Sequence, residues 1–111
     1  MLNVISFPAV KCREYRIAVN VLPGYYFLDK AVQLFVGKSI AESVAAINDA
    51  ELLDYTVACS HIVLIVHTKH DPEAVLFQVL ADVLRAINKA YPAPGISCIE
   101  DIFDCATIIP A

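Results

Sequence analysis

The chain has 111 residues, of which 59% are hydrophobic and 18% are charged, and its formal net charge at pH 7 is −4. This length is typical of one domain, residues 1–111, with its own core. The few basic residues are scattered, so we expect no nucleic-acid partner. The longest strongly apolar run, residues 62–66, is far shorter than the roughly 20 residues of a membrane-spanning helix, which predicts no membrane partner. Residues 1–10 lack the pattern of a secretory signal, so a cytoplasmic location and reduced cysteines are expected.

The first predicted element is a strand over residues 15–22. Tyr15, Ile17, Val19 and Val21 alternate there with more polar or smaller residues. The Pro-Gly pair that follows predicts a turn, after which residues 25–28 would fold back on the first strand. Residues 30–36 fit a strand face and a helix face about equally, and we favour the strand.

Ser39 and Glu42 have the spacing of a capping box, which predicts a helix start. Ile40, Val44 and Ile47 would form the apolar stripe of this helix, and it would resume at residues 50–53 after an interruption. Residues 56–68 are rich in β-branched side chains. Because residues 62–66 are apolar at both parities, we expect one long central strand that is buried on both faces.

The clearest element is a helix that runs from Asp71 to about Ala90. Asp71 can cap it, Pro72 suits its first position and Glu73 suits the positive end of the helix dipole. A final strand over residues 96–109 is expected, with a short helical turn at residues 100–104.

This order of elements predicts an α/β (α+β) fold. The expected architecture is a two-layer sandwich in which a mixed sheet of about four strands carries two helices on one face, in a ferredoxin-like arrangement. A small three-layer arrangement is the alternative.

The apolar content exceeds what a domain of this size usually hides, so we expect a homo-oligomer or a protein partner. The leading hypothesis is therefore a small non-enzymatic binding, regulatory or assembly module. No phosphate-binding loop, dinucleotide fingerprint or catalytic signature is present in the sequence, which favours a protein that is not an enzyme and predicts no cofactor.

A metal-dependent sensor or small enzyme is the second hypothesis. If residues 56–68 form one strand, Cys59, His61 and His67 project from the same face, and Cys59 and His61 could bind a soft divalent metal. Cys98 or Cys105 could supply a third ligand. The simpler interpretation is that Cys59 is a core residue and that both histidines make ordinary hydrogen bonds.

The junction from His67 to Asp71 is a candidate anion site, because it leads into the N-terminus of the long helix. Backbone N–H groups near Glu73 and Ala74, with Lys69 and His70 beside them, could hold a phosphate or a carboxylate. A solvated loop that only caps the helix is the alternative.

The acidic residues Glu100, Asp101 and Asp104 could bind a hard cation or act as an acid and base pair, although a solvated edge is more common. A third hypothesis for the whole chain is a protein-directed inhibitor of viral or mobile-element origin.

Overall fold

The computed structural model describes residues 2–6, 13–91 and 98–111. Seven helices and strands, together with two short 3₁₀ turns, make up this part of the chain. In chain order they are β1 (Asn3–Ser6), β2 (Glu14–Val21), η1 (Pro23–Tyr25), α1 (Lys30–Ala45), β3 (Ala50–Val57), β4 (His61–Thr68), α2 (Pro72–Ala90), η2 (Ile99–Asp101) and β5 (Phe103–Pro110).

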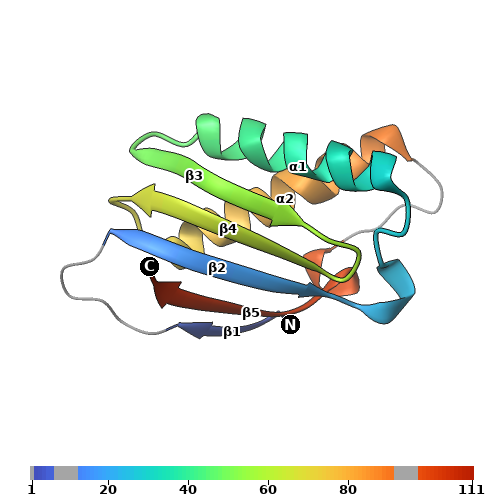
Figure 1. The fold of residues 1–111 in the computed structure, drawn as a ribbon, viewed down its shortest axis with the longest axis horizontal. Coiled ribbons are helices and arrows are strands. Elements are labelled where there is room, and N and C mark those ends of the chain that lie inside the picture. Colours follow the sequence, from blue (N-terminus) through green and yellow to red (C-terminus); the bar gives the residue numbers. More distant parts are fainter. Residues whose placement is uncertain (1, 7–12, 92–97) are drawn as a thin grey trace.

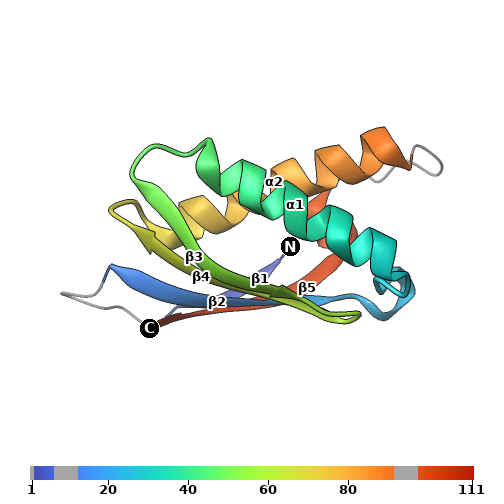
Figure 2. The ribbon, with the colours of Figure 1, turned by 45° about the horizontal axis from the view of Figure 1, so that its top comes forward.

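The strands form a single five-stranded sheet in the order β1-β5-β2-β4-β3. β2 lies antiparallel to both β4 and β5, β3 lies antiparallel to β4, and β1 lies parallel to β5. Both helices lie on the same side of this sheet (Figures 1 and 2). From β2 to β5 the order is βαββαβ, as in ferredoxin-like proteins. The predicted fold class is confirmed, with one strand more than expected.

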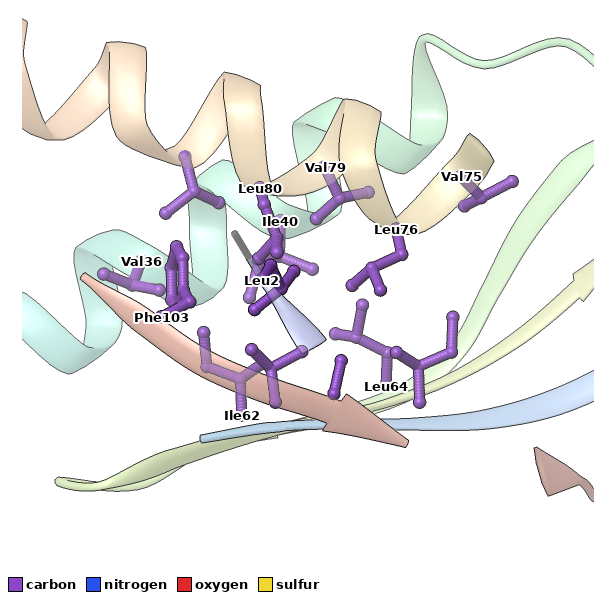
Figure 3. Close-up of a cluster of buried hydrophobic side chains, with 14 of the residues drawn as sticks. Leu2, Val36, Ile40, Ile62, Leu64, Val75, Leu76, Val79, Leu80 and Phe103 are labelled. Atoms are coloured by element: carbon purple, nitrogen blue, oxygen red, sulfur yellow. The ribbon is translucent and has the colours of Figure 1, made fainter. Parts of the chain in front are cut away.

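The core lies between the helices and the sheet, as Figure 3 shows. Leu64 on β4 and Leu76 on α2 are fully buried there, and so are Ile40 on α1 and Phe103 on β5. The expected helix is confirmed as α2: its apolar stripe is buried, and the Asp71 carboxylate accepts a hydrogen bond from the backbone N–H of Glu73.

The prediction of a strand at residues 30–36 was wrong, because this segment is the first half of α1. Asp29 caps the helix, and its carboxylate accepts a 2.8 Å hydrogen bond from the N–H of Ala31. Ser39 lies in the middle of α1 and donates to the carbonyl of Phe35, so the expected capping box does not exist. The alternation of apolar residues in this segment suggested a strand, but the helical spacing of apolar residues over a longer stretch predicts the structure correctly. Val36, Ile40 and Val44 form a stripe on α1 that faces the core.

The structure also corrects the segments on either side of β4. Residues 50–53 belong to β3 and do not extend the helix, because Asp49 takes a left-handed φ of 61° and reverses the chain. The predicted strand over residues 56–68 is divided between β3 and β4 by a hairpin turn at Cys59 and Ser60. After β2, the Pro-Gly pair begins the turn η1, and residues 25–28 form no strand.

The prediction of a C-terminal strand was correct, but the predicted strand was too long. β5 begins at Phe103, and the helical turn expected near residue 100 is η2. Residues 96–97 of the expected strand lie outside the described residues. β1, at the edge of the sheet beside β5, was not predicted at all.

Candidate interaction face

The sheet has a second face, which points away from the helices (Figure 2). No described residue covers this face, which we call the open face. Its positions follow from the strand register, and neighbouring strands place side chains in rows across it. One row contains Ile109, Arg16, Ile65 and Asp54, and the next contains Ile5, Thr107, Ala18, Val63 and Thr56.

The centre of the open face is apolar. Val63 and Ile65 on β4, with Ala18 on β2 and Ile109 on β5, lie there with partly exposed side chains. Ile5 on β1 is 57% exposed. A sheet with one face in water normally alternates apolar residues inside with polar residues outside. Residues 62–66 of β4 are apolar on both faces and do not alternate with polar residues, so the pattern fits a strand that is covered on both faces.

Charged and polar side chains lie among these apolar ones. Arg16 on β2 and Asp54 on β3 flank Ile65 in the same row, and Glu14 and Glu51 flank His67 in the row beyond. The Arg16 side chain makes no ion pair or hydrogen bond with the described residues, whereas one oxygen of Asp54 accepts a 2.8 Å hydrogen bond from the N–H of Tyr55. The open face thus combines apolar side chains with charged ones, and one of the charges, Arg16, lies on the middle strand of the sheet between Ile109 and Ile65.

The structure places the residues of the predicted metal site on two different elements, and the site itself stays a prediction. Cys59 lies in the turn between β3 and β4, so the argument that placed it on one strand face with His61 was wrong. His61 and His67 do share the open face, but they stand six residues apart, about 20 Å along the strand. Among the described residues, no three His, Cys, Asp or Glu side chains gather as metal ligands would.

Cys105 also lies on the open face, where its sulfur accepts a 3.1 Å hydrogen bond from the Asn20 side chain. Asn20 pairs in register with His61 and therefore lies between the thiol and the imidazole. With an intervening strand, the His61 ring is too far from the thiol to act as its base, since direct proton transfer needs about 3 Å.

The predicted anion site surrounds the start of α2. The Glu73 N–H is already occupied by the Asp71 carboxylate, and the His70 ring contacts the backbone carbonyl of Asn48. His70 and Ala74 line a cavity of about 550 Å³ between α1 and α2. Lys69 is exposed and Glu73 is partly buried, and neither is among the residues that line the cavity. The anion site remains a prediction.

Asp82 forms the polar wall of the same cavity. Its carboxylate accepts hydrogen bonds from Ser43 (2.6 Å), Gln78 (3.0 Å) and Arg85 (2.9 Å). Burial alone would raise the pKa of Asp82, but these hydrogen bonds and the Arg85 charge outweigh it and hold the pKa below its ordinary value. The carboxylate therefore links α1 to α2 and is already satisfied by the protein itself.

The acidic residues near the C-terminus belong to a local turn. The Asp101 carboxylate accepts a hydrogen bond from the backbone N–H of Cys98 at the start of η2. A hydrogen bond to Asp101, desolvation and the nearby Glu100 raise the pKa of the Cys98 thiol. Asp104 lies farther along, on β5.

No family model matches the chain, and no curated protein resembles it in sequence. Among solved structures, the chain is similar to a "putative transposase" from Deinococcus radiodurans R1. The two share 14% sequence identity and a TM-score of 0.74, over 95% of this chain and 83% of the other. At this identity the likeness establishes a shared fold. Neither of the described helices is long and apolar enough to cross a membrane.

The residues of the open face were missed as a site at the sequence level, although one signal for them was present. The apolar run in β4 indicated burial on both faces, and only one face is covered by helices. Which residues would surround Val63 and Ile65 could not be read from the chain, because this depends on the order of the strands.

Proposed function

We propose that this protein is a small non-enzymatic assembly module that binds protein through the open face of its sheet, with a second copy of itself as the first partner. The observation that supports this function is the apolar β4, whose Val63 and Ile65 side chains point away from every described core residue. Burying such side chains against a partner is favourable by about 25 cal/mol for each Å² removed from water.

The size of the open face agrees with this role. Four strands of eight residues and one of four, at about 4.8 Å between strands and about 3.3 Å per residue, give a surface of roughly 570 Å². Specific protein interfaces bury about 600–1,000 Å² on each partner. The face is therefore close to the lower limit for one specific partner, and we expect a weak, reversible complex.

The test is sedimentation velocity over a range of micromolar concentrations, with two variants of equal charge. Ile65→Lys places a charge at the centre of the open face, whereas Leu34→Lys places the same charge on α1, where Leu34 is 76% exposed. We expect the unmodified protein and Leu34→Lys to dimerise alike and Ile65→Lys to remain a folded monomer. A monomeric unmodified protein, or equal association of the two variants, would contradict the proposal.

A second candidate is a domain of mobile-element origin, which is favoured by the fold shared with the Deinococcus protein. If this origin still implied DNA binding, the protein would bind labelled DNA at low salt. The net charge of −4 leads us to expect no such binding. Fluorescence anisotropy with single-stranded and double-stranded oligonucleotides distinguishes the two cases.

A further inference from the structure

We propose that two copies pack open face to open face about a two-fold axis along β4, with Arg16 of each copy against the partner's Asp54. This inference rests on the proposed function and specifies the partner and its register. The argument begins with one row of the sheet. Arg16 pairs with Ile65 on one side of β4, and Asp54 pairs with Ile65 on the other.

The row Arg16–Ile65–Asp54 is therefore a positive side chain, an apolar side chain and a negative side chain at equal strand spacings. A two-fold axis that lies in the interface along β4 keeps each row at the same height and reverses the order of the strands. Ile65 then faces the partner's Ile65, and Arg16 faces the partner's Asp54. Symmetry repeats this contact, so one row provides two ion pairs around an apolar centre.

The next row supports a close approach along the same axis. Ala18 and Thr56 flank Val63 in it, so small side chains would face each other on both sides of a Val63 pair. Packed sheets lie about 10 Å apart, and small or β-branched residues allow that spacing. An axis along β2 would instead place Arg16 against its own copy, so the charge pattern selects β4.

The row that contains His67, near one end of the strands, lowers the affinity of this dimer. Glu14 and Glu51 flank His67 there, and the same axis brings Glu14 near the partner's Glu51. Like charges that face each other are destabilising. Only β2, β4 and β3 overlap, so each copy buries roughly 370 Å², which is less than the open face as a whole. Both features lead us to expect a weak, reversible dimer, which Glu51→Gln should tighten.

The experiment exchanges the two charges. Arg16→Asp and Asp54→Arg each place like charges in both symmetry-related contacts, so each variant alone should dimerise at least about tenfold more weakly, a difference of about 1.4 kcal/mol. Mixed in equal amounts, the two variants should form a heterodimer in which both ion pairs are restored, one in the original sense and one reversed. Native mass spectrometry resolves this heterodimer by mass.

Mixing oppositely charged variants can cause attraction that does not depend on the open face. The matched control is Lys38→Glu mixed with Glu42→Lys, because Lys38 and Glu42 lie on the exposed surface of α1, with side chains 77% and 70% exposed. We expect no preferred heterodimer from this pair. Asp54→Asn removes the charge but keeps an oxygen for the Tyr55 N–H, and should weaken the dimer without affecting the fold.

The outcomes separate this inference from the function on which it rests. If the unmodified protein dimerises but the Arg16 and Asp54 variants associate as well as it does, the register is wrong and the assembly function stands. A preferred heterodimer from the control pair also overturns the register. If the unmodified protein remains monomeric at every concentration, both proposals fail.

Discussion

Gly37 offers the sharpest test of the packing between α1 and the edge of the sheet. It lies inside α1, where alanine would ordinarily favour the helix by about 1 kcal/mol. A Cβ atom at Gly37, however, would lie 2.8 Å from Cε2 of the Tyr55 ring and 3.5 Å from its Cζ. The ring of Tyr55 on β3 therefore occupies the space that a side chain at Gly37 would need.

We expect Gly37→Ala to destabilise the protein slightly. Overpacking costs about 1–3 kcal/mol, and the Tyr55 ring is 42% exposed and can move outward, so the cost should be near 1.5 kcal/mol. Set against the gain in helix propensity, the net loss is about 0.5 kcal/mol. With Tyr55→Thr in the background the clash is absent, and Gly37→Ala should stabilise the protein by about 1 kcal/mol.

The measurement is a double-mutant cycle of urea unfolding on the four proteins, at equal m-values. The two substitutions should couple by about 1.5 kcal/mol, and the sign of the Gly37→Ala effect should change between backgrounds. If Gly37→Ala stabilises both backgrounds equally, the ring does not restrict this position and the reasoning is wrong.

Two further predictions concern α2. The pKa of Asp82 is below its ordinary value in the folded protein, so its contribution to stability is present above about pH 4 and is lost as pH falls through the folded pKa. Asp82→Asn should therefore lower the free energy of unfolding most at neutral pH and progressively less in acid, as measured by urea unfolding from pH 7 to pH 3 with the exposed Glu42→Gln as control. Asp71→Ala removes the cap at the Glu73 N–H and should cost about 1 kcal/mol, while Asp71→Ser should recover most of it; equal melting temperatures for the two variants would contradict the cap.

The elements that the sequence predicted correctly are those in which local signals agree. In α2 a cap, a proline at the first position and a stripe at helical spacing all indicate the same helix. β2 alternates cleanly because helices cover only one of its faces. For both elements, the local pattern and the tertiary surroundings require the same residues, so the prediction did not depend on the rest of the fold.

The errors occurred where a local signal had two interpretations. The Ser39 and Glu42 spacing matches a helix start, but the real start is Asp29, ten residues earlier, and Ser39 bonds back to Phe35 inside the helix. The β-branched stretch over residues 56–68 contains its own hairpin turn, although Cys59 and Ser60 lack the usual Asn-Gly signal. That one missed turn also accounts for the incorrect placement of Cys59 beside His61.

From the sequence we could predict that β4 needs a partner surface, but not which residues surround it. The sequence indicated that β4 needs apolar cover on two sides, and the structure shows that α1 and α2 cover one side only. The charges beside Val63 and Ile65 come from β2 and β3, which lie far apart in the sequence, and their meeting in one row depends on the pairing of both strands with β4. A single slip in either register would turn Arg16 or Asp54 away from the open face. The register is therefore the physical link between this chain's excess of apolar residues and a specific partner, because it places opposite charges at equal distances on either side of the strand that most needs to be covered.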